Sequence, residues 1–136
     1  MGTVEFITNG EQETRAAAAE TAKRLKIGDV ILYEGEMGAG KTVFAKGVAS
    51  GLGIQDEILS PTYAYMNDYY GKLYHYDCYR LKCGEQAEAL GLTDYFYADG
   101  ICLIEWASNI SSVLPEKVKT VTILKTGEDE RSISYE

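Results

Sequence analysis

The segment Gly35–Thr42, which reads Gly-Glu-Met-Gly-Ala-Gly-Lys-Thr, constrains this chain more than any other. It matches G-x-x-x-x-G-K-[ST], the phosphate loop of nucleoside triphosphatases. Glycines let the backbone curl so that successive N–H groups face phosphate oxygens, the lysine carries positive charge to the outer phosphates, and the threonine hydroxyl suits magnesium. The residues expected to hold the phosphates are Gly35, Glu36, Met37, Gly38, Ala39, Gly40, Lys41 and Thr42.

The flanks of this loop predict the fold class. Val30–Tyr33 is an apolar run typical of a buried strand, and Thr42–Leu52 is typical of a helix whose positive N-terminal end faces the phosphates. A strand, a phosphate loop and a helix imply a largely parallel central sheet flanked by helices, with a second strand beside the first after a right-handed crossover. We expect an α/β, P-loop NTPase-like fold.

The rest of the chain shows alternating helical and strand patterns without a repeat or a linker. At 136 residues it is expected to form a single P-loop ATPase domain, residues 1–136. The further elements expected are strands at Thr3–Thr8 and Ile101–Trp106, helices at Glu11–Lys26, Gly84–Leu92 and Asn109–Leu114, a turn or helix at Thr93–Ala98, a β-hairpin of Tyr63–Tyr70 and Lys72–Tyr79 around Gly71, and C-terminal antiparallel strands at Lys117–Lys125 and Arg131–Tyr135.

Charge and composition exclude several function classes. The net charge is −8, from 13 basic and 21 acidic residues, whereas a protein that binds nucleic acid by itself usually carries a basic face. A role in nucleic-acid metabolism would therefore run through a partner. The three cysteines, Cys78, Cys83 and Cys102, are expected as free thiols, and the lone His75 excludes a multi-histidine metal site. No apolar run has the length of a membrane span and no signal peptide is visible, so a cytoplasmic location without membrane contact is expected.

A phosphate loop needs a carboxylate across the magnesium, at the end of a neighbouring hydrophobic strand. Glu105 ends the apolar run Ile101–Ile104, where open α/β sheets place their ligands. Asp77 ends Leu73–Tyr76, a mixed aromatic strand that is less clearly central. We favour Glu105 as the carboxylate nearest the metal, directly or through water, and Asp77 for positioning the attacking water or supporting the site. A surface carboxylate on a hairpin is the alternative for Asp77.

Thr62 is a candidate switch residue. It follows Ser60-Pro61 on an extended segment, and its hydroxyl could approach the terminal phosphate or its metal. A simple proline-led loop entry is the alternative. The expected catalytic residues are therefore Lys41, Thr62, Asp77 and Glu105, with Thr42 and Glu105 as metal ligands.

Two other nucleotide-dependent functions are alternatives to hydrolysis of ATP. A guanine-specific switch protein needs an N-K-x-D motif, which is absent, and Asp68–Gly71 fits D-x-x-G only within a polar turn. A small-molecule or protein kinase with a P-loop usually adds a lid and an acceptor-binding insertion, for which 136 residues leave little room. The kinase stays the alternative function.

Several segments form a distinctive set by their order and spacing: Gly35–Thr42, Ser60–Tyr63, Tyr74–Leu81, Leu90–Leu92 with Asp94–Phe96, and Ile101–Trp106. Together these segments resemble the bacterial ATPase family of tRNA threonylcarbamoyladenosine biosynthesis, called TsaE or YjeE. The resemblance covers nearly the whole chain. Glu36 and Met37 stand where the family often has Asp and Leu, a variation that leaves phosphate binding untouched.

The resemblance implies a Mg²⁺-dependent ATPase of low intrinsic activity that binds ATP and ADP and acts with two partner proteins, TsaB and TsaD. TsaD transfers the threonylcarbamoyl group to the adenosine beside the anticodon, tRNA is held by the partners, and the ATPase resets the complex. It also implies that Thr42 and Glu105 serve magnesium and that Asp77 and Thr62 serve hydrolysis and a switch-like segment. Trp106, which follows the metal carboxylate, would respond to nucleotide or else pack in the core.

Overall fold

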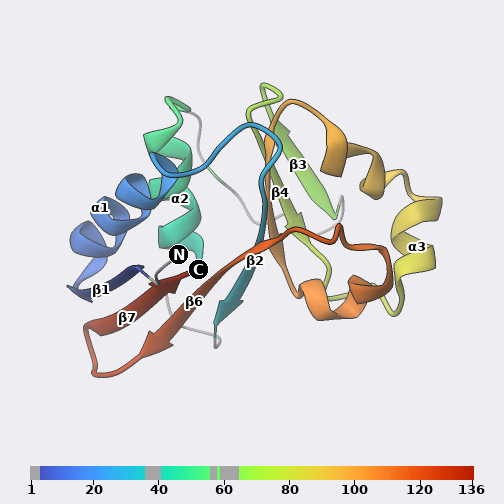
Figure 1. The fold of residues 1–136 in the computed structure, drawn as a ribbon. Coiled ribbons are helices and arrows are strands. Elements are labelled where there is room, and N and C mark those ends of the chain that lie inside the picture. Colours follow the sequence, from blue (N-terminus) through green and yellow to red (C-terminus); the bar gives the residue numbers. More distant parts are fainter. Residues whose placement is uncertain (1–3, 36–40, 56–57, 59–64) are drawn as a thin grey trace. The chain divides into compact units, whose positions relative to one another are not determined.

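The computed structural model describes residues 4–35, 41–55, 58 and 65–136, and its fold is drawn in Figure 1. The chain divides into two compact units. The first comprises Met1–Leu25, Glu34–Leu59 and Thr120–Glu136, and the second comprises Lys26–Tyr33 and Ser60–Lys119. The expectation of a single ATPase domain stays a prediction.

The first unit combines an antiparallel set of strands with two helices. Strand β1 (Val4–Asn9) pairs with β7 (Glu130–Tyr135), which pairs with β6 (Lys119–Lys125). This confirms the predicted C-terminal antiparallel pair. Helices α1 (Glu11–Ala22) and α2 (Lys41–Gly51) lie side by side (Figure 1).

Two glycines allow the close approach of α1 and α2. A Cβ added to Gly47 would lie 2.5 Å from both the Ala18 Cβ and the Arg15 carbonyl oxygen. One added to Gly51 would lie 2.7 Å from the Ala22 Cβ. Such distances are shorter than any real packing contact, so side chains at these two positions would force the helices apart.

Helix α1 ends earlier than predicted, which corrects the expected range Glu11–Lys26. After Ala22 the chain tightens, because the N–H groups of Arg24 and Leu25 donate to the carbonyls of Thr21 and Ala22, three residues back. The Asp29 carboxylate then accepts the Lys26 N–H at 2.8 Å. No basic residue lies in the last turn of α1.

The second unit contains a mostly parallel set of strands in the order β2-β5-β4-β3. Strands β2 (Val30–Gly35), β5 (Ile101–Glu105) and β4 (Leu73–Asp77) run parallel, and β3 (Met66–Tyr69) pairs antiparallel with β4. The last two residues of β2 belong to the first unit. The predicted neighbour of the strand before the phosphate loop is thus β5. The α/β class with an antiparallel hairpin is confirmed.

The hairpin differs from the predicted one in length and in the position of its second arm. Asp68 accepts the Gly71 N–H at 2.8 Å, so the D-x-x-G match is a turn, as expected. Strand β4 lies between β3 and β5, and its residues from Leu73 to Tyr76 are buried. It is therefore an interior strand, which corrects the expectation that it was less clearly central. Tyr63 and Ala64 lie outside the described residues.

The tyrosines of β4 are buried and pack their rings against other aromatic rings of this unit. The Tyr76 hydroxyl donates to the Leu92 carbonyl at 2.8 Å, and its ring lies 5.7 Å from that of Phe96. The Tyr74 ring lies 4.9 Å from that of Tyr95. These partners come from the 3₁₀ helix η1 (Leu92–Tyr97), so the aromatic strand and this helix form one core.

The remaining helices are short. Helix α3 (Gly84–Ala89) stops before the predicted Leu92, since Gly91 takes a left-handed conformation with φ of 76°. The second 3₁₀ helix, η2 (Ala107–Val113), replaces the predicted helix at Asn109–Leu114. None of the helices that the structure describes is long and apolar enough to cross a bilayer.

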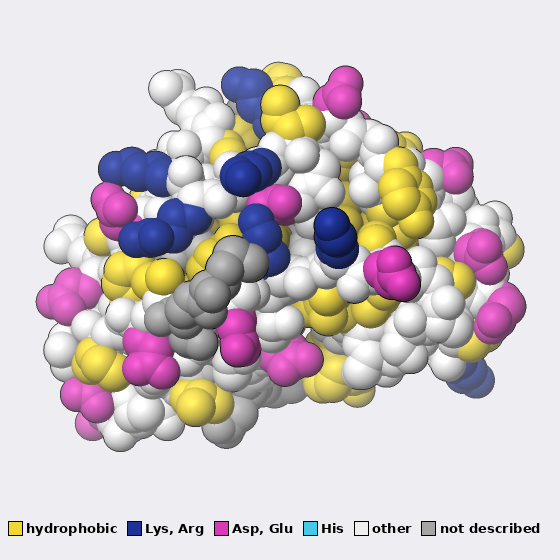
Figure 2. All heavy atoms as spheres, viewed as in Figure 1, with side chains coloured by type: hydrophobic (Ala, Val, Ile, Leu, Met, Phe, Trp, Pro, Cys, Tyr) yellow, Lys and Arg dark blue, Asp and Glu magenta, His cyan; other side chains and the backbone are white. Residues whose placement is uncertain are grey.

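The thiols agree with the sequence, whereas the charged side chains are unevenly distributed. On the face drawn in Figure 2, most lysine and arginine side chains gather in the upper left and centre with a few acidic side chains among them, and acidic side chains predominate elsewhere. The three cysteines are free, as predicted, with Cys78 and Cys102 buried and Cys83 partly exposed.

Candidate functional site

The two ends of the phosphate loop lie close together in the first unit. Gly35 is the last residue of β2 and Lys41 the first residue of α2. A Cβ added to Gly35 would lie 3.6 Å from the Lys41 Cγ and 3.0 Å from the Ile123 carbonyl oxygen. A side chain at Gly35 would therefore require the Ile123 carbonyl to shift by a few tenths of an ångström. The intervening residues, 36–40, lie outside the described part of the chain.

Helix α2 begins with the two polar residues of the motif. Lys41 is partly buried and Thr42 is exposed. The N–H groups of a first helical turn have no intrahelical acceptor and carry the positive end of the helix dipole. This arrangement suits an anion such as a phosphate group.

Three polar side chains lie level with one another in the second unit. Glu105 at the end of β5 is in register with Tyr33 of β2 and with Asp77 of β4. Because paired residues of adjacent strands project to the same side of a sheet, the Glu105 and Asp77 carboxylates share one face and the carboxyl ends of two parallel strands. Open α/β sheets bind their ligands at such ends.

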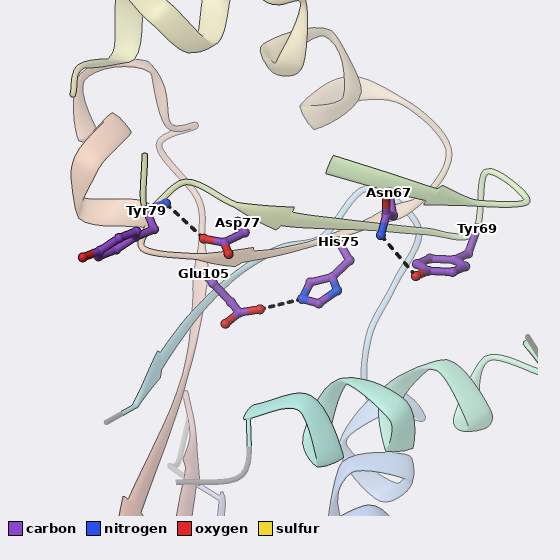
Figure 3. Close-up of polar contacts among 6 residues, drawn as sticks. All are labelled: Asn67, Tyr69, His75, Asp77, Tyr79 and Glu105. Atoms are coloured by element: carbon purple, nitrogen blue, oxygen red, sulfur yellow. Dashed lines mark hydrogen bonds and ion pairs between the residues drawn. The ribbon is translucent and has the colours of Figure 1, made fainter. Parts of the chain in front are cut away.

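A buried histidine holds the Glu105 carboxylate. The His75 Nε2 and the Glu105 Oε2 are 2.7 Å apart (Figure 3), and their side chains are only 3% and 14% exposed. Since a carboxylate accepts hydrogen bonds, the imidazole donates from Nε2. The other ring nitrogen, Nδ1, is buried without a hydrogen-bond partner among the residues that the structure describes.

The Asp77 carboxylate is held by backbone instead. Its Oδ1 accepts the N–H of Tyr79 at 3.0 Å (Figure 3). The side-chain amide of Asn109 fixes this same segment, donating to the carbonyls of Cys78 at 3.0 Å and Tyr79 at 3.3 Å. The turn after β4 therefore sets the direction of Asp77.

Both carboxylates act on the buried groups beside them. Burial raises the pKa of the Cys78 thiol to about 12, and the charges of Asp77 and Glu105 add to the shift. Burial likewise raises the pKa of Tyr33 well above its ordinary value, with Glu105 as a second cause. The Cys78 thiol and the Tyr33 phenol therefore keep their protons at neutral pH.

Trp106 lies at the surface and not in the core. Its backbone is left-handed, with φ of 59° and ψ of 38°, which is uncommon for a bulky residue. Its side chain is 43% exposed, and its ring lies 5.0 Å from that of the exposed Tyr79. The chain thus changes direction directly after Glu105, at the position of the only tryptophan in the sequence.

The donors expected for magnesium are of the right chemical kind. Within the described ranges, no group of three or more histidine, cysteine, aspartate or glutamate side chains could hold a metal by itself. Magnesium bound with a nucleotide does not need such a group, because phosphate oxygens and water supply most of its ligands. One hydroxyl and one carboxylate, those of Thr42 and Glu105, suit that chemistry. Their roles, and those of Lys41 and Asp77, stay predictions, and Thr62 lies outside the described residues.

Sequence reasoning missed His75 and Asn109. The signal for His75 was its spacing, because it precedes Asp77 by two residues and a strand places such residues on one face. Asn109 gave no local signal, since its two acceptors are 30 and 31 residues away in the chain.

Comparisons with known proteins agree on one family. The model of the family "Threonylcarbamoyl adenosine biosynthesis protein TsaE" matches residues 8–133. The tRNA threonylcarbamoyladenosine biosynthesis protein TsaE of Bacillus subtilis (strain 168) is 42% identical over 138 residues, which is 99% of this chain and 86% of the relative. Its counterpart from Treponema pallidum (strain Nichols) is 37% identical over 130 residues, or 94% of this chain and 96% of the relative.

A solved structure is similar to this chain in fold as well as in sequence. The structure described as "Crystal structure of Bacillus subtilus YdiB" aligns with a TM-score of 0.81 and 40% sequence identity, over 98% of this chain and 84% of that one. The P-loop NTPase-like fold expected from the sequence is thereby confirmed. By the family model, its relatives and this structure, the chain belongs to the TsaE family.

Proposed function

We propose that this chain is the magnesium-dependent ATPase of a tRNA threonylcarbamoyladenosine modification machinery, working in the cytoplasm with TsaB and TsaD proteins. The observation that carries the proposal is the family match over residues 8–133, which includes the whole phosphate-loop motif. Both relatives described above are named for biosynthesis of this modification.

The proposed roles follow from position and chemistry. The backbone of Gly35–Thr42 and the Lys41 ammonium would hold the phosphates of ATP or ADP at the start of α2. Thr42 and Glu105 would provide oxygen ligands to Mg²⁺, which neutralises charge on the transferring phosphoryl group. Asp77, with its carboxylate fixed by the Tyr79 N–H, would orient the attacking water.

The other two predicted site residues have roles in sensing the nucleotide. Thr62 would act as a switch residue and Trp106 would respond to the bound nucleotide from its position directly after Glu105. The tRNA would be held by the partners, because a chain with a net charge of −8 lacks the excess of positive charge that phosphate binding requires.

Following the terminal phosphate separates hydrolysis from the kinase alternative. The protein is incubated with Mg²⁺ and ATP labelled on that phosphate, and the products are separated. We expect the label in inorganic phosphate, with a Lys41→Ala control that releases none. Label on the protein, on an added protein or on a small molecule would favour the kinase instead.

A further inference from the structure

We infer that His75 is a positioning residue for Glu105, whose carboxylate it holds in the conformation that would serve the magnesium of the bound nucleotide. The inference rests on the proposed function, in which Glu105 serves the metal. His75 would touch neither the metal nor the nucleotide. It would act only through the contact of its Nε2 with the Glu105 Oε2.

The strand register makes this contact a product of the fold. His75 pairs with Leu103 on β5, and Glu105 is the next residue of that strand on the same face. The imidazole thus reaches diagonally toward the strand end, as Figure 3 shows. At 2.7 Å the contact has the short length of a hydrogen bond to a charged acceptor.

Burial indicates that the imidazole is present for this one bond. His75 is 2% exposed, and burying a polar ring has a free-energy cost unless its polar atoms are bonded. Nδ1 is buried without a partner among the described residues, so part of that cost stays uncompensated. A leucine would fill a similar volume without this cost of burying a polar atom. The Nε2 bond to Glu105 is the interaction that offsets the cost.

Glu105 has a physical need for such a partner. A glutamate side chain has three rotatable bonds, and it loses rotamer entropy when held in one conformation. Hydrogen-bond partners of metal-binding carboxylates fix that conformation in advance, and their removal typically lowers metal affinity by about 10–100-fold. Asp77 gets its direction from the Tyr79 backbone N–H instead.

The test measures by calorimetry how Mg²⁺ strengthens ADP binding to variants of the full chain. The quantity compared is the Mg²⁺ midpoint, the concentration that gives half of the increase in ADP affinity. His75→Leu fills the space without a donor, and His75→Gln restores an N–H at similar reach. Leu73→Ala is the matched control, since Leu73 lies on the same strand and face and is fully buried. Thermal unfolding and ADP affinity without magnesium are recorded for each variant.

We expect His75→Leu to raise the Mg²⁺ midpoint by about 10–100-fold, with magnesium-free ADP affinity unchanged. His75→Gln should recover most of the loss. Leu73→Ala should lower the melting temperature and leave the midpoint unchanged. If His75→Leu does not fold, His75→Asn, whose shorter amide cannot reach Glu105, takes its place.

Three results would overturn the inference. A folded His75→Leu protein with the wild-type midpoint shows that the bond does not matter to the metal. An equal rise in Leu73→Ala shows that any core defect has the same effect, and a His75→Gln midpoint no better than that of His75→Leu shows that the N–H is irrelevant. If the wild-type protein itself binds ADP without regard to magnesium, the proposed function fails first, which distinguishes the two failures.

Discussion

Asp77 and Glu105 are paired residues at the carboxyl ends of the adjacent parallel strands β4 and β5, yet their carboxylates are held in different ways. Glu105 accepts a hydrogen bond from a buried imidazole, and Asp77 accepts one from the backbone of its own turn. Glu105 is thus held by a side chain of the neighbouring strand, and Asp77 by the turn that follows its own strand. Under the proposed function this difference predicts separable defects when each is changed.

Replacing Glu105 should mainly affect magnesium. Glu105→Ala removes a metal ligand, so we expect magnesium-dependent hydrolysis to fall by about 100-fold or more. Nucleotide binding in the absence of magnesium should be almost unchanged, because the phosphate loop is intact. Both are measurable by phosphate release and by calorimetry with EDTA. Equal losses of hydrolysis and of magnesium-free binding would mark Glu105 as structural.

Replacing Asp77 should affect the rate and not binding. Asp77→Asn keeps an oxygen that can accept the Tyr79 N–H but removes the charge that orients the water. We expect kcat to fall by about 100-fold, with the KM for ATP and the magnesium requirement near wild-type values. Steady-state kinetics over a magnesium series test this. A large shift of the magnesium midpoint would instead assign Asp77 to the metal.

The contact of α1 with α2 predicts an unusual effect of alanine. Alanine normally stabilises a helix by about 1 kcal/mol relative to glycine. At Gly47, however, a methyl group would collide with Ala18 and Arg15, and such overpacking destabilises by about 1–3 kcal/mol. Denaturant unfolding should show Gly47→Ala to be less stable than wild type, with the exposed Ser50→Ala of the same helix as control. A more stable Gly47→Ala protein would contradict the packing.

The buried thiols predict a loss of stability at alkaline pH. Burial raises the pKa of Cys78 and of Cys102 from 9.0 to about 12, so the folded state retains protons that the unfolded state releases. The free energy of unfolding should therefore fall as pH rises from 9 toward 12, and these two groups should have no effect below pH 9. Denaturant unfolding across this range should show a smaller fall for a Cys78→Ala, Cys102→Ala protein than for wild type. Equal falls would show that the thiols do not contribute.

How much could be predicted depended on whether the signal was local. The strand that ends at Gly35 and the helix that begins at Lys41 were predictable from one motif and its flanks. The position of Ile101–Glu105 beside β2 followed from its apolar run, because only a strand buried on both faces needs one. The end of α1 was not predictable, since hydrogen bonds of the following turn, and not helix propensity, decide it.

The interior position of β4 and the contact of His75 with Glu105 depend on long-range structure. Tyr74, His75 and Tyr76 form a mixed aromatic run that does not indicate an interior strand, but the Tyr76 hydroxyl donates to a carbonyl 16 residues away. His75 and Glu105 are 30 residues apart, and only the register of β4 on β5 brings them together. The alternation of side chains along a strand predicts that His75 and Asp77 lie on one face of β4. It does not identify the hydrogen-bond partner of either side chain.

The central claim is that this chain hydrolyses ATP as the regulated part of a larger tRNA-modification complex. The most direct measurement is magnesium-dependent phosphate release by the protein alone and after addition of purified TsaB and TsaD from the same organism. The account predicts slow release alone and a marked stimulation by the two partners together, abolished by Lys41→Ala. Unchanged release in the presence of both partners would contradict it.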